Sequence, residues 1–213
     1  MEQQAPQQQA PRQQNPQASQ GGALARFQGD HFLARKKVFS FLGNKFHIYG
    51  PSEDLRFFVK QKAFKLKEDI TVFTDESMTT PVLKIGARSW QDFSGTYDVT
   101  TPNGEKIGSL KREGLRSIFK DKWLILDDAD QPVGEIEEDS TFAALMRRFL
   151  SNLIPQTFNV RLNGQQVAVF SQHFNPFIAK YDIDFSLDQN DNLDRRLGIA
   201  AVVLLLAIEG RQN

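Results

Sequence analysis

The chain contains short segments in which apolar and polar side chains alternate, and these segments recur about every 25 residues from Phe32 onward. Each unit has one alternating segment, a polar turn and then a second alternating segment. Alternation with a period of two is typical of β-strands, because successive side chains point to opposite faces of a sheet. The predicted first strands span residues 46–49, 70–73, 97–100, 123–126, 158–161 and 181–184, and the second strands 57–59, 82–85, 107–110, 133–136 and 167–170.

The residues between these segments favour turns. Asn103-Gly104 and Asn163-Gly164 are typical of tight hairpins, and residues 129–132 suit a longer one. Many consecutive hairpins at regular spacing favour closure of the sheet. The sequence therefore predicts an all-β domain over residues 30–210, built as a closed antiparallel barrel of about twelve strands.

The C-terminal region follows a different pattern. Residues 197–208 contain no polar side chain, so a helix over 194–209 would be apolar on every face and must lie inside a protein or a bilayer. Twelve helical residues span roughly 18 Å, less than the roughly 30 Å of a hydrocarbon core. A barrel of about twelve strands is also too wide for its wall side chains to fill. We expect this helix to occupy the barrel lumen, and a partial membrane anchor is the alternative.

Two further segments stand outside the strand repeat. Residues 140–154 carry apolar side chains at helical spacing, with Arg147, Arg148 and Asn152 away from that stripe and Pro155 after it. They predict an inserted amphipathic helix that packs on the barrel or contacts a membrane or a partner protein. Residues 1–25 form a tail rich in glutamine and proline, which has almost nothing to bury and is predicted to be disordered.

Composition narrows the class of protein. Lysine plus arginine equals aspartate plus glutamate, at 26 each, which argues against a nucleic-acid partner. The chain has no cysteine, and its start lacks the features of a signal peptide, so a cytoplasmic location is expected. His31, His47 and His173 are not spaced for a metal site or placed beside a plausible nucleophile, and no phosphate-binding glycine loop is present. We therefore expect no enzyme activity and no cofactor.

The sequence also resembles a known group. Residues 181–188, Leu193-Asp194-Arg195-Arg196 and the apolar stretch to Glu209 resemble the end of the phospholipid scramblases. Lysine-aromatic segments at residues 36–41 and 62–66 resemble the LURP-one-related proteins. Both families belong to the Tubby C-terminal-like superfamily, and the resemblance covers roughly residues 30–210. It implies a twelve-stranded barrel around a central hydrophobic helix. The chain departs from animal scramblases in its glutamine-rich tail and its lack of cysteine.

Groups of basic residues are candidates for lipid binding. They fall near the junctions between hairpins, so several could converge at one rim of the barrel and attract anionic headgroups. The resemblance implies the same, because Tubby-type domains bind phosphoinositides through basic residues. A solvated surface balanced by nearby acidic residues is the alternative. The candidates are Lys36, Lys37, Lys60, Lys62, Lys65, Lys111, Arg112 and Arg116.

Acidic residues before the last helix suggest a weak calcium site. Residues 188–192 begin like an EF-hand loop, but Leu193 and Ile199 stand where that loop needs glycine and glutamate. The resemblance to scramblases implies a calcium segment here. The alternative is a polar loop in which Asp194 caps the helix. The candidate ligands are Asp182, Asp184, Asp188 and Asp194.

These features predict a non-enzymatic barrel protein that binds anionic lipid at the periphery of a membrane. Phospholipid scrambling is the activity that the resemblance implies, although a lumen filled by a helix offers no evident path for headgroups. The alternative is a soluble scaffold that binds a protein through its tail or the 140–154 helix. A carrier of a small ligand in the lumen is disfavoured, because the helix is expected to fill that space.

Overall fold

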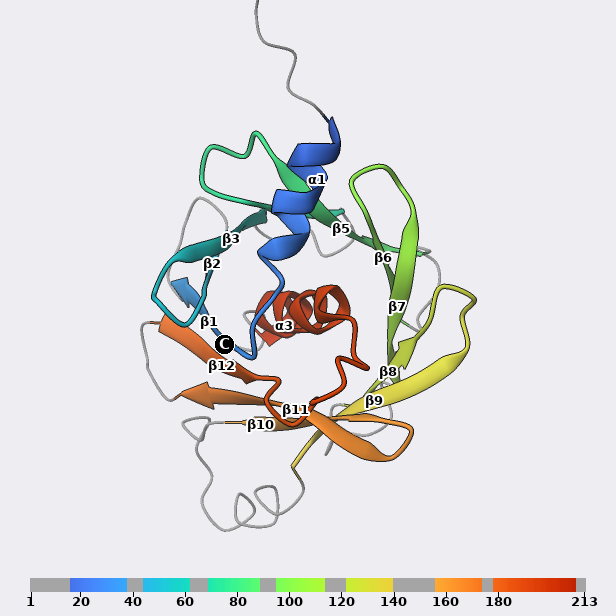
Figure 1. The fold of residues 1–213 in the computed structure, drawn as a ribbon. Coiled ribbons are helices and arrows are strands. Elements are labelled where there is room, and N and C mark those ends of the chain that lie inside the picture. Colours follow the sequence, from blue (N-terminus) through green and yellow to red (C-terminus); the bar gives the residue numbers. More distant parts are fainter. Residues whose placement is uncertain are drawn as a thin grey trace, which may run out of the picture.

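Twelve β-strands form a closed antiparallel barrel (Figure 1). This computed structural model describes residues 16–37, 44–61, 69–88, 95–113, 122–139, 156–173 and 178–209. The strand order is β1-β12-β11-β10-β9-β8-β7-β6-β5-β4-β3-β2, and β2 pairs with β1 to close the barrel. The prediction of an all-β fold with a twelve-stranded closed barrel is confirmed. The strands are β1 (His31–Lys37), β2 (Asn44–Tyr49), β3 (Leu55–Gln61), β4 (Ile70–Phe73), β5 (Pro81–Ala87), β6 (Thr96–Thr100), β7 (Lys106–Glu113), β8 (Lys122–Leu126), β9 (Pro132–Glu138), β10 (Thr157–Leu162), β11 (Gln165–His173) and β12 (Ile178–Asp184).

The alternating segments of the sequence form the wall of this barrel. Each of the eleven predicted segments lies within a strand, and β1 is an additional strand that the pattern did not single out. In β10, Phe158, Val160 and Leu162 are buried and the residues between them are partly exposed. The hairpin between β10 and β11 turns at Asn163 and Gly164, whose φ angles are +49° and +81°. Positive φ at both positions is the geometry that Asn-Gly supplies in a tight hairpin.

Helix α3 (Arg195–Glu209) lies inside the ring of strands (Figure 1). Its apolar side chains from residue 197 to residue 207 are all buried and belong to one core with the inward-facing residues of the strands. Asp194 caps the helix, because its Oδ1 accepts a hydrogen bond of 2.9 Å from the backbone amide of Arg196. A helix that is apolar on all sides is thus surrounded by apolar wall residues on all sides.

The structure corrects the prediction that residues 1–25 are disordered. Pro16–Ala25 forms helix α1, while residues 1–15 lie outside the described residues. Contacts that follow α1 hold it on the barrel: the ring of Phe27 packs against that of Phe57, with centroids 4.4 Å apart. Nη1 of Arg26 donates to the carbonyl oxygens of Leu55, Arg56 and Thr74. Composition alone could not reveal these tertiary contacts.

The two ends of the barrel differ in what they present. Strands β1, β3, β5, β7, β9 and β11 finish at one end, which we call the basic end; α3 begins at the other, which we call the acidic end. The connections at the acidic end are residues 50–54, 74–80, 101–105, 127–131, 163–164 and 185–194. Those at the basic end fall largely outside the described residues, and they include the predicted 140–154 helix.

Candidate functional site

A row of lysines crosses the outer wall of the barrel at its basic end. Lys45 of β2 lies directly opposite Lys60 of β3. The pairing of β1 with β2 ends at Lys36 and Phe46, and Lys37 and Lys45 are the next residues of the two strands. Lys45 and Lys60 are exposed. Lys37, Lys45 and Lys60 therefore occupy neighbouring positions on three adjacent strands, and we call them the lysine row.

The lysine row, considered alone, lowers the stability of the fold. Like charges directly opposite one another on paired strands repel. Neither Lys45 nor Lys60 forms an ion pair with another described side chain. Arg35 and Lys180 lie directly opposite each other on β1 and β12, and Arg35 also lies 4.0 Å from the carboxylate of Glu53. Lys45 and Lys60, which have no ion pair within the described part of the chain, are suited to bind an anion.

Lys36 was predicted to bind lipid, and the structure places it in the interior of the barrel instead. Its side chain points into the barrel and is only 3% exposed. Nζ donates a hydrogen bond of 2.8 Å to the carbonyl oxygen of Leu206 and lies 5.3 Å from the ring centroid of Phe46. That carbonyl is one of the last four of α3, which have no partner within the helix. Lys36 therefore caps the C-terminus of α3, where a positive charge is favourable, and it cannot contact a lipid.

The structure separates the other predicted lipid-binding residues. Lys37 and Lys60 belong to the lysine row. Lys111 and Arg112 end β7 at the same end of the barrel, but on the far side from β1 (Figure 1). Lys62, Lys65 and Arg116 lie outside the described residues. Sequence reasoning missed Lys45 and Lys180, because only the register between strands brings them next to the predicted residues.

At the acidic end, most of the described carboxylates have a hydrogen-bond or ion-pair partner in the fold. Asp75 accepts hydrogen bonds from the hydroxyl and the backbone amide of Ser77 and from the hydroxyl of Thr74, and these bonds lower the pKa of its carboxyl. Oδ1 of Asp127 accepts from the backbone amides of Ala129 and Gln131, at 3.0 and 2.7 Å. These bonds fix the turns between strands, a use typical of aspartate.

The buried pair Asp188–Arg195 fixes the start of α3. Asp188 accepts hydrogen bonds from the backbone amides of Asn192 and Leu193 and a bond of 2.7 Å from Nη1 of Arg195. Arg195 also stacks over the ring of Phe185, 4.6 Å from its centroid. Burial alone would raise the pKa of Asp188, but the two amides and the guanidinium outweigh it and hold the pKa below its ordinary value. The charge of Asp188 is therefore committed to the fold.

The four predicted calcium ligands are not brought together. Asp182 pairs with His173, and Asp184 lies 3.5 Å from Nδ1 of His31. Asp194 forms an ion pair with Arg196, in addition to capping α3. Within the described ranges, no three histidine or acidic side chains are grouped so that they could hold a metal ion. A calcium ion at Asp188 would have to compete with the Arg195 guanidinium.

Each histidine of the chain pairs with a carboxylate. Nε2 of His47 lies 2.7 Å from Glu76, and His31 and His173 pair with Asp184 and Asp182. Asp182 and Asp184 lie two residues apart on the outer face of β12, so their pairs are neighbours, whereas His47 lies on β2. The Asp184 carboxylate of the His31 pair also accepts hydrogen bonds from the hydroxyl and the backbone amide of Ser186.

Within the described residues, neither helix is long and apolar enough to cross a membrane.

The structure defines an all-β domain built as a closed antiparallel barrel of twelve strands. Comparison with protein families matches residues 55–206 to LURP-one-related proteins. The match covers more than half of the chain, and the protein belongs to the LURP-one-related family. A comparison with curated proteins found no match. The predicted membership in this family is confirmed.

Proposed function

We propose that this LURP-one-related protein is a non-catalytic, peripheral membrane protein whose basic end binds anionic phospholipid. The observation that carries the proposal is the lysine row, in which Lys45 and Lys60 face each other without a described ion pair. Each basic residue near an anionic surface contributes about 1 kcal/mol of attraction. Lys180 on β12 adds to this positive wall, and Arg35 opposite it is paired with Glu53.

The charges of the two ends would orient the barrel on such a surface. The connections at the acidic end contain no lysine or arginine, and their acidic residues are Glu53, Asp54, Asp75, Glu76, Glu105, Asp127, Asp128, Asp130, Asp188, Asp191 and Asp194. An anionic membrane therefore repels this end and attracts the lysine row. We expect the barrel axis to be roughly perpendicular to the membrane surface, with the start of α3 directed away from the lipid.

The sequence of the connections at the basic end supports the same orientation. Aromatic side chains favour the interface between water and lipid, where their apolar bodies and polar edges are both accommodated. The acidic-end connections contain one aromatic residue, Phe185, and it is buried. In contrast, the segments that join the strands at the basic end contain Phe39, Phe41, Phe64, Trp90, Phe93, Phe119, Phe142, Phe149, Phe174 and Phe177.

The protein is expected to bind lipid and not to scramble it. Scrambling requires a polar path along which a headgroup crosses the hydrocarbon core. Helix α3 lines the lumen with apolar side chains from Leu197 to Ala207. The interior of a single barrel is therefore unsuited to a phosphate headgroup, and the scramblase resemblance extends to the fold and the membrane surface only.

Flotation of the protein with lipid vesicles tests the proposal. The wild type is expected to float with vesicles of phosphatidylcholine and phosphatidylserine, and not with phosphatidylcholine alone. Binding should weaken as salt is added, because screening shortens the range of exposed charges to about 10 Å at 0.1 M. The Lys45→Gln/Lys60→Gln variant should bind roughly thirtyfold more weakly, which corresponds to about 2 kcal/mol.

A charge-matched control separates the lysine row from net charge. Lys84 and Arg161 lie on other parts of the wall, where Lys84 donates to the carbonyl of Pro102 and Arg161 pairs with Glu137. The Lys84→Gln/Arg161→Gln variant should bind like the wild type. Equal loss in both variants would mean that net charge alone drives binding, and the site assignment would be wrong.

Two further outcomes of the same experiment are informative. We expect calcium to change the flotation little, because Asp188 and Asp194 are engaged by arginines. No flotation with any vesicle would refute lipid binding. The hypothesis of a scaffold that binds a protein through the tail or the 140–154 segment would then take its place.

A further inference from the structure

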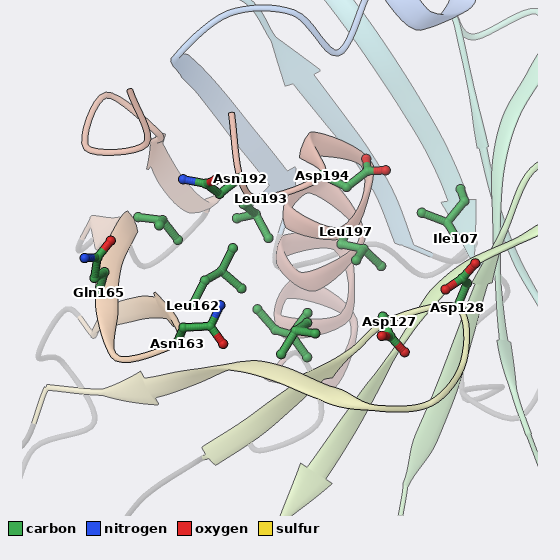
Figure 2. A pocket seen from close by; sticks show the side chains of 13 residues that line it. Ile107, Asp127, Asp128, Leu162, Asn163, Gln165, Asn192, Leu193, Asp194 and Leu197 are labelled. Carbon is green, nitrogen blue, oxygen red and sulfur yellow. The ribbon is translucent and has the colours of Figure 1, made fainter. Parts of the chain in front are cut away.

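A cavity of about 440 Å³ opens at the acidic end, between the start of α3 and the wall formed by β7 to β11 (Figure 2). Its volume lies within the range of sites for small molecules, which is about 300–1,000 Å³. The cavity is remote from the lysine row, which lies on β1, β2 and β3 at the other end. It is therefore independent of the proposed lipid-binding surface.

The cavity exists because α1 covers only one side of the barrel mouth. Arg26 and Phe27, which follow α1, are attached to β3 and to the turn after β4. In Figure 1, α1 lies over the strands β3 and β5, across the mouth from β8 to β11. The side chains of Ile107 and Val133 are consequently left partly exposed on the uncovered side. Apolar surface in a concave site favours binding of an apolar group.

The lining of the cavity has an apolar inner part and a polar rim. The inner part is apolar and includes Ile125, Leu162 and Leu197. The rim carries the carboxylates of Asp127 and Asp128 on one side, and the amide side chains of Asn163, Gln165 and Asn192 on the other (Figure 2). None of the described residues that line the cavity is basic. This arrangement disfavours fatty acids and phosphates and favours a cation.

The two carboxylates at the rim have capacity for a ligand. Only Oδ1 of Asp127 is used by the turn, where it accepts from Ala129 and Gln131, and Asp128 is exposed. Asp194, in contrast, is occupied by Arg196. The rim also offers amide oxygens that accept hydrogen bonds, which an ammonium with N–H groups can donate.

We infer that this cavity binds a small amphipathic amine, with its apolar body against Ile107, Ile125 and Leu197 and its ammonium group at Asp127 and Asp128. A primary or secondary ammonium fits better than a quaternary one. The reason is that the rim supplies hydrogen-bond acceptors and no aromatic cage among its described residues. The sequence predicted no ligand in the lumen, and the cavity lies at the mouth instead, where α3 begins.

Isothermal titration calorimetry with n-octylammonium below its micelle concentration tests this inference, with octanoate and octanol as probes of the same length. Octylammonium should bind saturably, octanol more weakly and octanoate not measurably. Lengthening the chain from hexyl to octyl should tighten binding about fourfold for each methylene that enters the cavity. Equal binding of octanoate or octanol, or no saturable binding of octylammonium, would overturn the inference.

Matched variants separate the cavity from the general charge of this end. Asp127→Asn and Asp128→Asn should each weaken octylammonium about two- to fivefold, while the turn bonds to Oδ1 of residue 127 can remain. Asp75→Asn removes a charge from another turn of the same end and should change binding less than twofold. If Asp75→Asn weakens binding as much as Asp128→Asn, surface potential explains the effect and the site is wrong.

A variant that fills the cavity provides a test that does not involve charge. Val133→Phe adds volume to the partly exposed lining of the cavity and should abolish binding. Leu187→Phe enlarges a side chain that is 52% exposed at the same end and does not line the cavity. It should bind octylammonium like the wild type. Unchanged binding by a folded Val133→Phe variant would place the amine elsewhere and refute the assignment.

Discussion

The two ends of the barrel use charge in opposite ways. At the acidic end, Asp188 is buried against Arg195, and Asp75 and Asp127 accept backbone hydrogen bonds in their turns. At the basic end, Lys45 and Lys60 face each other on the outer wall without a described ion pair. Most charges where α3 begins thus hold the chain, with Asp128 and Oδ2 of Asp127 as the exceptions at the cavity, whereas Lys45 and Lys60 near the other end are left available for a partner.

Lys36 shows that the position of a charged residue in the fold, and not the sign of its charge, decides whether the charge is structural or available. It belongs to β1 at the basic end, next in sequence to Lys37. Because β1 alternates, Phe32, Ala34 and Lys36 face inward and are at most 3% exposed. Lys36 therefore supports α3, whereas its neighbour belongs to the lysine row. Variants at the two ends should separate the structural charges from the available ones.

The largest effect is expected for Lys36→Glu. The new carboxylate would be buried against the carbonyl of Leu206 and the negative end of the α3 dipole. Loss of a buried, paired charge costs about 3–5 kcal/mol, and the repulsion adds to it. Urea denaturation should show at least this loss in the free energy of unfolding, or no folded state. Lys60→Glu, on the exposed wall, should stay within about 0.5 kcal/mol of the wild type. Equal stability of the two variants would mean that Lys36 does not cap α3.

Asp188→Asn should be the next most harmful change. It removes the charged acceptor of Arg195 and of two amides, which is worth about 1.5–3 kcal/mol at neutral pH. The pKa of Asp188 is lowered in the fold, so its contribution is present above the unfolded value of about 3.9. It disappears as the pH falls through the lower folded value. Wild type and variant should therefore converge in stability below about pH 4, as measured by denaturant unfolding at several pH values.

Asp191→Asn is the control for this prediction. Asp191 also pairs with Arg195, at 2.9 Å, but its side chain is 85% exposed. Its loss should cost less than about 1 kcal/mol. If Asp191→Asn is as destabilising as Asp188→Asn, burial is not what makes the Asp188 charge important.

Gly198→Ala tests packing at the start of α3. A Cβ atom at this position would lie 2.6 Å from Cε1 and Cζ of Phe185. The clash should destabilise the fold by about 1–3 kcal/mol, although alanine is the better helix former. Gly21→Ala in α1 has open space around it and should be neutral or slightly stabilising. Thermal unfolding compares the two, and a Gly198→Ala variant as stable as Gly21→Ala would contradict close packing of Phe185 on α3.

The smallest effect on stability is expected for Lys45→Gln/Lys60→Gln. Removal of two like charges that face each other should leave the free energy of unfolding unchanged or raise it by about 0.2–0.5 kcal/mol. The same variant should lose vesicle binding, as described above. A loss of stability larger than 1 kcal/mol in chemical denaturation would show that these lysines are structural.

Much of the fold could be read from the sequence because its signals are local. Alternation within 158–161 and the Asn163-Gly164 turn specify β10 and its hairpin without reference to the rest of the chain. Helix α1 could not be predicted, because Phe27 on Phe57 and Arg26 on the β3 carbonyls hold its end. Strand alternation from Phe32 and Ala34 predicts that Lys36 faces inward, but its charge favoured a place on the surface.

The sequence by itself determined the twelve-stranded barrel and the family, since both depend on periodicity and motifs along the chain. Only the tertiary structure decided which charges are available. The register between β1, β2 and β3 sets Lys37, Lys45 and Lys60 side by side. Burial beside α3 commits Lys36 and Asp188 to the fold. The physical reason is that the energy of a charge depends on its neighbours in space and its exposure to water, and neither is encoded by position along the chain.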